Sequence, residues 1–299
     1  MKTPRISASS YSNTAPLIWS FLYGSQHGQV ELILDNAPSR SAELLAQDRV
    51  GAALVPVIAY QLLPDVRLVP DVCVGAKEKV RSVALITRGM DLEDVRSVSL
   101  DTSSKTSVVL TKIIFREFLE REPEWRNAAP NIDAMLDESD AALLIGDPSL
   151  KIADCGLRIA DLASATSQSS DSRSIGSATD DHSGESAIRD PQSAIRKFDL
   201  AELWKRYTSL GFVFAMWMTK LDKITIDLAA ARDEGLDHLD EIAANYSELG
   251  LSLDAMREYL SENISYSIDD SMRAGMELYF RLAGKCGLID GVKPAAYLQ

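Results

Sequence analysis

The sequence predicts an α/β protein built from two lobes, and three observations lead to that prediction. Of its 299 residues, 46% are hydrophobic and 25% are charged, which is the balance of a folded protein with a sizeable core. Short apolar segments alternate with longer helical patterns, which indicates a mostly parallel sheet. Two predicted strands, around 83–86 and 213–217, bracket a self-contained α/β block. The chain would therefore leave one lobe, build a second and return through a hinge at these strands.

The predicted elements follow one another in an order that fits this architecture. Strands are expected at 30–34, 52–57, 66–74, 81–87, 95–100, 141–145 and 211–218. Helices are expected at 14–23, 40–47, 105–120 and 200–207, with a run of amphipathic helices over 222–287. We therefore assign residues 1–84 and 215–299 to lobe I and residues 85–214 to lobe II.

The segment 166–193 breaks this pattern inside lobe II. Ser, Asp, Gly and Ala dominate it, and large apolar residues are almost absent. Such a composition buries too little surface to offset the entropy lost on ordering. We expect a disordered surface insertion without an assigned function, and we expect His182 within it to be a bystander.

Composition excludes several classes of function. A formal net charge of −13 argues against nucleic acid as a partner, although it leaves an anionic small molecule open. No segment approaches the roughly 20 apolar residues of a membrane helix, and the apolar segment 15–23 lacks the features of a signal peptide. Cys73, Cys155 and Cys286 show no disulfide or metal-ligand spacing. We expect a cytoplasmic protein without a metal, a cofactor or a membrane contact.

Histidine-led catalysis is not expected either. The chain has three histidines: His27 in a predicted turn, His182 in the insertion and His238 on a polar helix. None accompanies a candidate nucleophile, and no glycine-rich phosphate loop is present in the sequence.

Three strand-to-helix turns carry clusters of small polar residues, at 9–16, 101–107 and 146–149. In a parallel sheet such turns lie at the carboxyl ends of the strands, where ligands bind. Helix N-termini there favour an anion by about 0.3–1 kcal/mol when exposed and by up to about 2 kcal/mol when partly buried. Helix capping alone also explains such clusters. Seven successive polar residues at 101–107 exceed what one cap needs, so two facing turns would suit a dicarboxylate. Asp147 would repel an anion, so we expect it to act as a cap or to accept from a hydroxyl.

The same turns carry a resemblance to a known family. The sequences SYSNTAP, LDTSSKTS, LIGDP and FVFAMW, at residues 10–16, 100–107, 144–148 and 212–217, resemble successive blocks of the MqnA family. That family comprises the chorismate dehydratases of the futalosine route to menaquinone. The similarity runs from about residue 4 to residue 285, interrupted by the insertion. It implies a periplasmic-binding-protein-like fold of type 2, a Venus flytrap with hinge strands and C-terminal helices.

The resemblance also implies the reaction. Chorismate would lose its 4-hydroxyl group and the proton at C3, giving aromatic 3-[(1-carboxyvinyl)oxy]benzoate and water. The enolpyruvyl carboxylate of the substrate can take the proton, so the protein needs no histidine. It must hold the dianion in one conformer, assist departure of the hydroxide and exclude water.

Site residues follow from the resemblance, position by position. It implies that Asn13 contacts the departing hydroxyl and that Ser82 lines the site near the hinge, so these two form the catalytic pair. The expected substrate-binding residues are Ser10, Tyr11, Ser103, Ser104, Thr106, Ser107, Gly146 and Asp147.

Three alternatives stay open at this point. A lyase like 1,4-dihydroxy-6-naphthoate synthase shares the fold, but its first block differs and it is expected to use a histidine base. A non-catalytic protein that binds a small carboxylate is the second alternative, and a descendant that has lost activity is the third. A transient contact with the next enzyme of the pathway and the oligomeric state are also left open.

Overall fold

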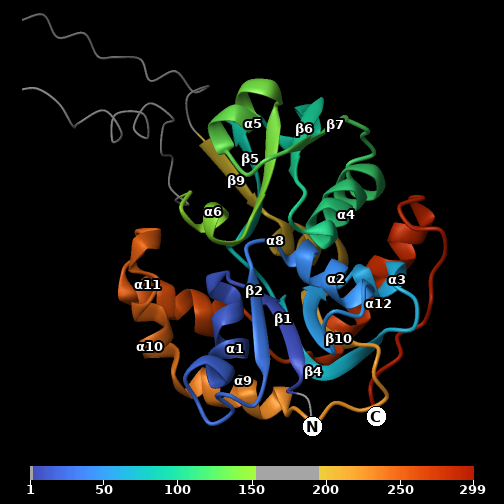
Figure 1. Ribbon diagram of the computed structural model, residues 1–299. Coiled ribbons are helices and arrows are strands. Elements are labelled where there is room, and N and C mark those ends of the chain that lie inside the picture. The colour runs from blue at the N-terminus through green and yellow to red at the C-terminus, as the bar shows by residue number, and fades with distance from the viewer. Residues whose placement is uncertain (1–2, 153–194) are drawn as a thin grey trace, which may run out of the picture.

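The computed structural model describes residues 3–152 and 195–299, arranged in two lobes that lie one above the other (Figure 1). Each lobe contains one five-stranded sheet. The predicted insertion at 166–193, with His182, lies outside the described residues, as does Cys155. The two-lobed α/β architecture expected from the sequence is confirmed.

Lobe I, the lower lobe of Figure 1, has the strand order β2-β1-β3-β10-β4. Its strands are β1 (Arg5–Ser9), β2 (Glu31–Asp35), β3 (Ala52–Pro56), β4 (Arg67–Ala76) and β10 (Phe212–Thr219). β1 runs parallel to β2 and β3, whereas β10 runs antiparallel to β3 and β4. All five residues of β3 are buried, because helices cover both faces of this sheet.

Lobe II has the strand order β7-β6-β8-β5-β9. Its strands are β5 (Val83–Arg88), β6 (Ser97–Asp101), β7 (Glu124–Ala128), β8 (Ala141–Ile145) and β9 (Ile195–Asp199). β6 is parallel to β7 and β8, and β5 is antiparallel to β8 and β9. Both sheets are therefore mixed, but four of the five strands in each run in the same direction, so the expectation of a mostly parallel sheet is confirmed. The strands that follow a crossing, β5 and β10, enter their sheets from the other lobe and so run against their neighbours.

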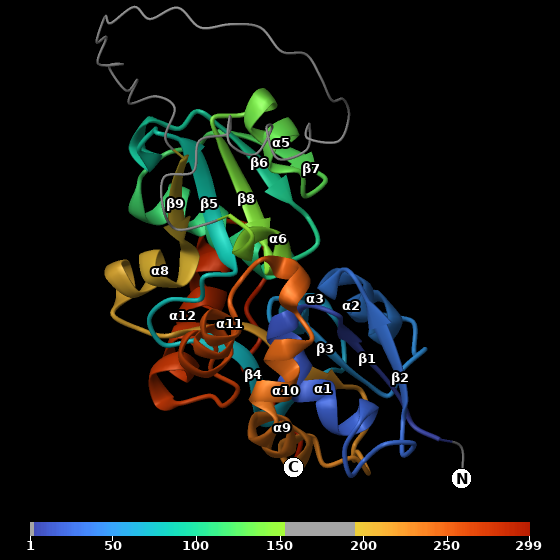
Figure 2. The ribbon, with the colours of Figure 1, turned by 90° about the vertical axis from the view of Figure 1, so that its left-hand side faces the viewer.

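Helices flank both sheets (Figures 1 and 2). Lobe I carries α1 (Ala15–Leu22), α2 (Pro38–Ala46), α3 (Ala59–Leu62), α9 (Leu228–Asp237), α10 (Leu239–Ala244), α11 (Leu253–Glu258) and α12 (Asp270–Lys285). Lobe II carries α4 (Lys105–Ile113), α5 (Ile132–Glu138) and α6 (Gly146–Leu150), and α8 (Leu200–Thr208) lies between the lobes. The helix predicted at 105–120 is α4 continued by a π turn, Ile114–Phe118. A second π turn, Tyr259–Asn263, continues α11.

The two connections between the lobes are joined by one buried carboxylate. Asp199 accepts hydrogen bonds from the backbone N–H groups of Val80 and Arg81 in the connection from β4 to β5. It also caps α8, in the return connection, by accepting from the N–H groups of Ala201 and Glu202. Arg81 has a positive φ of 61°, so this turn is unusually tight for a residue other than glycine. Asp199 therefore holds the two crossings at a fixed separation.

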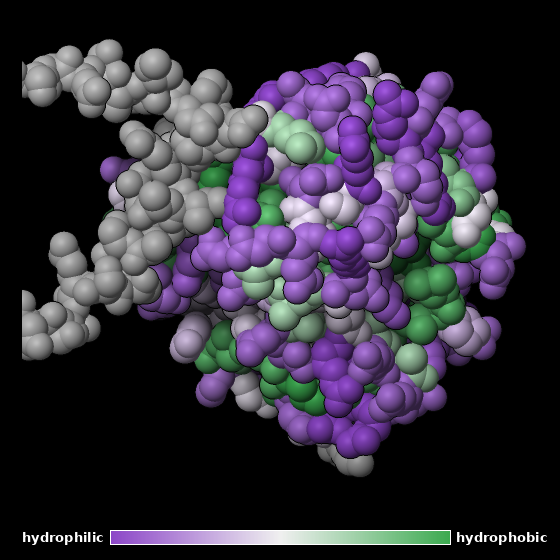
Figure 3. Space-filling model, turned by 90° about the horizontal axis from the view of Figure 1, so that it is seen from above, coloured by the Kyte–Doolittle hydropathy of each residue, from purple (hydrophilic) through white to green (hydrophobic). Residues whose placement is uncertain are grey.

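Aromatic side chains fill the region beneath these crossings. The rings of Trp204, Phe212 and Tyr279 meet edge to face at centroid distances of 5.1–6.4 Å. They come from α8, β10 and α12, so this cluster joins elements on both sides of the hinge. The face of lobe II seen from above is largely hydrophilic, with apolar side chains in small patches (Figure 3). No described helix is long and apolar enough to cross a bilayer.

Candidate active site

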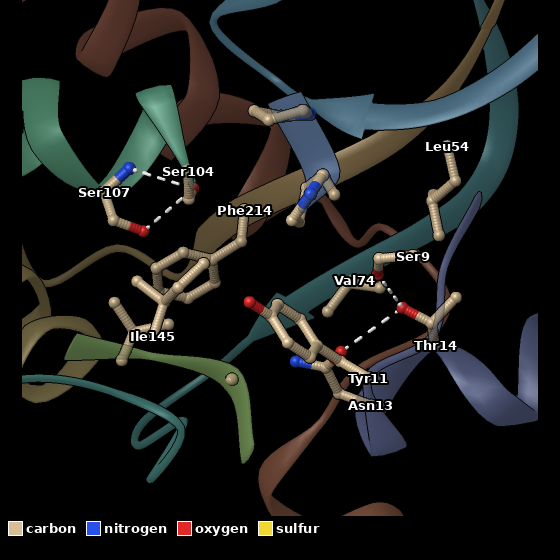
Figure 4. A pocket seen from close by; sticks show the side chains of 15 residues that line it. Ser9, Tyr11, Asn13, Thr14, Leu54, Val74, Ser104, Ser107, Ile145 and Phe214 are labelled. Atoms are coloured by element: carbon tan, nitrogen blue, oxygen red, sulfur yellow. Dashed lines mark hydrogen bonds between the residues drawn. The ribbon is translucent and has the colours of Figure 1, made fainter. Parts of the chain in front are cut away.

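A small pocket opens where the three polar turns meet between the lobes (Figure 4). Its volume is about 50 Å³. The strands β1, β6 and β8 end at its walls, so the three polar turns do follow strand ends as expected, although β1 itself was not among the predicted strands. The lining residues are Ser9, Tyr11, Asn13, Thr14, Pro38, Leu54, Pro56, Val74, Val83, Ser104, Ser107, Ile145, Gly146, Phe214 and Ala215.

The first wall comes from lobe I, directly after β1. Residues Ser12–Thr14 form a 3₁₀ turn that leads into α1, where Pro16 fits the first helical turn. The hydroxyls of Ser9 and Thr14 are 2.8 Å apart, and the Thr14 hydroxyl also donates to Asn13 Oδ1 at 3.3 Å. This network presents the Asn13 amide and the Tyr11 ring to the pocket (Figure 4).

The second wall is the N-terminus of α4 in lobe II. Ser104 is its N-cap and accepts from the Ser107 N–H at 3.4 Å, and the Ser107 hydroxyl donates to Ser104 Oγ at 3.1 Å. Both hydroxyls face Tyr11 and Asn13 across the pocket (Figure 4). The helix dipole and the free N–H groups of the first turn make this wall attractive to an anion.

The third wall is the turn after β8, and it holds the lobes together. Gly146 has a φ of +63°, and a Cβ atom there would lie 2.8 Å from the Tyr11 ring, so this ring position requires glycine. Asp147 accepts from the Ser12 hydroxyl at 2.5 Å and from the Ser12 N–H at 3.1 Å. It thus accepts from a hydroxyl, one of the two roles the sequence suggested, and it links lobe II to lobe I.

Other hydrogen bonds reinforce this closed arrangement. The Ser39 N–H of α2 donates to the Ser103 carbonyl at 3.1 Å. Thr106 Oγ1 accepts from the Ile58 N–H at 3.2 Å, and the Tyr279 hydroxyl donates to the Thr106 carbonyl at 3.0 Å. The two lobes therefore contact each other at both edges of the pocket.

The electrostatics of the pocket depend on neutral groups, because none of the lining residues is charged. The nearest carboxyls belong to Asp101 and Asp147. Burial raises the pKa of both above the usual aspartate value, against the hydrogen bonds from Ser103 and Ser12. Burial also raises the pKa of the Tyr11 phenol, so that the phenol stays protonated and can donate. An anion in this pocket would be held by hydroxyls, amides and the helix dipole.

The pocket gathers some of the predicted site residues and leaves others outside. Tyr11, Asn13, Ser104, Ser107 and Gly146 line it. Ser10 instead donates to Asn36 Oδ1, and the Ser103 hydroxyl donates to Asp101. Thr106 and Asp147 make the interlobe contacts described above. Ser82 is fully buried in the connection before β5, beside the lining residue Val83.

Sequence reasoning missed several residues of the site. Ser9 and Thr14 lie inside the first polar turn, and Phe214 lies inside the FVFAMW block. The sequence pattern at these positions could therefore have identified them as residues that line the pocket. Asp101 belongs to the second turn, but its burial beside Tyr11 depends on the packing of two lobes. Tyr259 lies next to Asn13 and Ser82 in the structure, but no motif in the sequence around it marks it as a site residue.

The described histidines lie elsewhere. His27 is exposed in the turn after α1. His238 stacks on Trp19, with ring centroids 3.8 Å apart, and its Nδ1 is 2.8 Å from the Glu234 carbonyl. Neither lines the pocket.

Solved structures share this architecture. A protein from Archaeoglobus fulgidus aligns over 95% of this chain and 98% of its own, with a TM-score of 0.60 and 15% identity. The periplasmic aliphatic sulphonate binding protein of Escherichia coli aligns over 99% and 93%, with a TM-score of 0.57 and 12% identity. A Candida albicans protein with the generic periplasmic binding protein fold aligns over 100% and 98%, with a TM-score of 0.60 and 11% identity. These likenesses confirm the periplasmic-binding-protein-like fold.

Sequence comparison is more specific. A chorismate dehydratase from Thermus thermophilus is 28% identical over 285 residues, which cover 92% of this chain and 93% of that protein. A protein family described as menaquinone biosynthesis matches residues 4–168 and 184–285. With its fold and its sequence matched over nearly the whole length, the chain belongs to this menaquinone biosynthesis family.

Proposed function

We propose that this protein is a chorismate dehydratase, which converts chorismate to 3-[(1-carboxyvinyl)oxy]benzoate and water. The observation that carries the proposal is a pocket without a charged lining residue, placed between a helix N-terminus and a turn that presents the Asn13 amide. Such a pocket suits an anion that brings its own base. The similarity to a chorismate dehydratase supports the same substrate.

Each wall of the pocket has its own role in the proposed reaction. The first turn of α4, with Ser104 and Ser107, holds one carboxylate of the dianion. Asn13 donates its amide hydrogen to the 4-hydroxyl, which departs with its bonding electrons. The enolpyruvyl carboxylate removes the C3 proton, the C3–H electrons complete the aromatic ring, and the hydroxide and the proton together make water. A neutral donor suits this step because it stabilises the developing hydroxide without adding negative charge.

Lobe movement is part of this function. A buried water needs at least roughly 10–15 Å³ and occupies about 30 Å³ in the liquid, so a pocket of about 50 Å³ holds only a few waters. A ring with two carboxylate-bearing groups needs more space than that. The lobes therefore lie closer together here than they can around chorismate, so they part to admit the substrate and close around it to a lesser degree.

The proposal is tested by incubating the purified protein with chorismate and separating the products by chromatography. Loss of chorismate matched by formation of the carboxyvinyloxy-benzoate is the expected result. Tight binding without turnover would favour a binding protein instead, and neither binding nor turnover would overturn both readings. A synthase like that of 1,4-dihydroxy-6-naphthoate is disfavoured because none of the residues lining the pocket is a histidine.

We also propose that the protein works in the cytoplasm. Cys73 and Cys286 are free thiols, which a reducing compartment preserves. Cell fractionation with an antibody against the protein tests this location, and recovery in an exported fraction would contradict it.

A further inference from the structure

The hydroxyl of Tyr259 is buried without a hydrogen-bond partner among the described residues. Tyr259 begins the π turn that continues α11, and none of its side chain reaches solvent. A buried hydroxyl left unpaired costs about 1–3 kcal/mol. Such groups call for a physical explanation, and π turns recur at functional sites.

The surroundings of this hydroxyl supply that explanation. The side chains beside it are those of Ser82, Asn13 and Ser12. Burial raises the pKa of the phenol well above its usual range, and these three neighbours only partly oppose that effect. The phenol therefore keeps its proton at any working pH and is available as a donor.

Asn13 and Ser82 are only loosely held by their other partners. Asn13 Oδ1 accepts from the Thr14 hydroxyl at 3.3 Å, and the Ser82 hydroxyl donates to the Val80 carbonyl at 3.4 Å. Both distances exceed the 2.5–3.0 Å range typical of hydroxyl hydrogen bonds. Tyr259 is a further polar group beside both side chains, and its rigid ring comes from a helical segment remote in sequence.

We propose that Tyr259 is a positioning residue, whose hydroxyl donates a hydrogen bond to the Asn13–Ser82 pair once the ligand is bound. This assignment rests on the proposed function, because it acts through the two residues assigned to the reaction. The Tyr259 hydroxyl has no partner of normal geometry among the described residues, although Ser82, Asn13 and Ser12 lie beside it. The proposed hydrogen bond strengthens as charge develops on the departing hydroxyl, so its loss lowers kcat more than it raises KM.

Replacing Tyr259 with Phe tests the proposal by removing one oxygen and keeping the ring. We expect kcat for chorismate to fall about tenfold and KM to change by less than about twofold. We also expect Tm to stay level or to rise, because no existing hydrogen bond is lost. Tyr266→Phe is the matched control. Its hydroxyl is likewise buried and unpaired, but its neighbours are Tyr259 and Tyr246. This control should keep the wild-type kcat.

A mutant cycle adds a readout that a purely structural role would not move. In a background that carries both Asn13→Ala and Ser82→Ala, Tyr259→Phe should lower kcat by less than about twofold, because both residues on which it acts are already gone. A full tenfold effect in that background would overturn the proposal. Wild-type kcat in Tyr259→Phe, or an equal loss in Tyr266→Phe, would overturn it as well. If the wild-type protein does not turn chorismate over, the proposed function fails first and this assignment fails with it.

Discussion

In the proposed mechanism, the neutral amide of Asn13 takes the place of a catalytic acid. Its Oδ1 is engaged by the Thr14 hydroxyl, which leaves the NH₂ group to face the pocket. A charged side chain in place of Asn13 would change the electrostatic potential of the pocket more than the neutral amide does, because the buried carboxyls of Asp101 and Asp147 lie nearby. The amide therefore adds a donor to the pocket without changing its net charge.

Removing this donor should slow the chemical step. We expect Asn13→Ala to lower kcat by about 10²–10³-fold, the usual effect of losing one donor at a developing oxyanion, with a smaller change in KM. Steady-state kinetics with chorismate measure both constants. Asn245→Ala, at an exposed asparagine outside the pocket, serves as the control. Intact activity in Asn13→Ala would remove Asn13 from the mechanism.

Substrate binding should take up protons through Asp101 and Asp147. Burial already raises the pKa of both carboxyls in the closed form, and a bound dianion would raise them further. Because the bound state holds protons more tightly, affinity is highest below the ligand-free pKa values. It should fall as the pH rises from those values to the higher values of the complex. Titration calorimetry from mildly acidic to neutral pH, in buffers of different ionisation enthalpy, measures the uptake.

Two substitutions serve as the control for that measurement. Asp147→Asn and Asp101→Asn should each remove part of the proton uptake, since each deletes one titrating group. Binding heats that do not depend on the buffer in the wild-type protein would contradict the prediction.

At the scale of elements, the turn between β8 and α6 sets how closely the lobes approach. The missing side chain of Gly146 allows the Tyr11 ring to pack against the backbone, and the next residue, Asp147, then reaches Ser12. This turn therefore couples the backbone of lobe II to the first wall of the pocket.

Gly146→Ala should hinder closure. The new Cβ would meet the Tyr11 ring at 2.8 Å, and the left-handed backbone adds a penalty of roughly 1–2 kcal/mol. We expect kcat to fall about tenfold. Gly250→Ala is the control, because Gly250 has a φ of +77° with no atom within 4 Å of the added Cβ. It should lower Tm and leave kcat unchanged, whereas an equal loss of kcat in both variants would contradict the steric argument.

The elements that could be predicted from the sequence are those with a strong local pattern. Buried apolar strands such as β3 and β8 were found with nearly correct ends, and so were the polar turns that follow β1, β6 and β8. The short strands β1, β7 and β9 were missed. Their residues are small or alternate with charged ones, and their pairing depends on neighbours distant in sequence.

The same limit applies to the site. Tyr11, Asn13 and Ser107 were proposed from the family resemblance, which the polar turns after β1 and β6 carry. The Ser12–Asp147 contact and the burial of Tyr259 arise only when remote segments pack together. The reversed direction of β5 and β10 also escaped prediction, because apolar periodicity is the same for parallel and antiparallel strands.

At the scale of the whole molecule, one carboxylate connects the two crossings on which lobe movement depends. Asp199 is buried and accepts four backbone hydrogen bonds from both connections. Its position suits a hinge point, because its hydrogen bonds would keep the two crossings together while the lobes rotate.

Asp199→Ala should destabilise the protein by more than the loss of a helix cap. It removes the acceptor of the buried Val80 N–H group as well as the cap of α8, so we expect a loss of roughly 2–4 kcal/mol in the free energy of unfolding. Asp227→Ala, which removes the exposed cap of α9, should cost only about 1 kcal/mol. Denaturant unfolding compares the two variants. Equal losses would mean that Asp199 acts as a cap alone.

The contacts that join Ser12 to Asp147 and Ser39 to Ser103 hold the two lobes against each other. In the proposed cycle these contacts must break before chorismate can enter, so only the open fraction of the protein can bind it. The apparent dissociation constant is the intrinsic constant divided by the open fraction. Weakening a contact that the lobes do not remake around the substrate would enlarge that fraction and tighten apparent binding, whereas weakening one that they do remake would slow the closure that turnover requires.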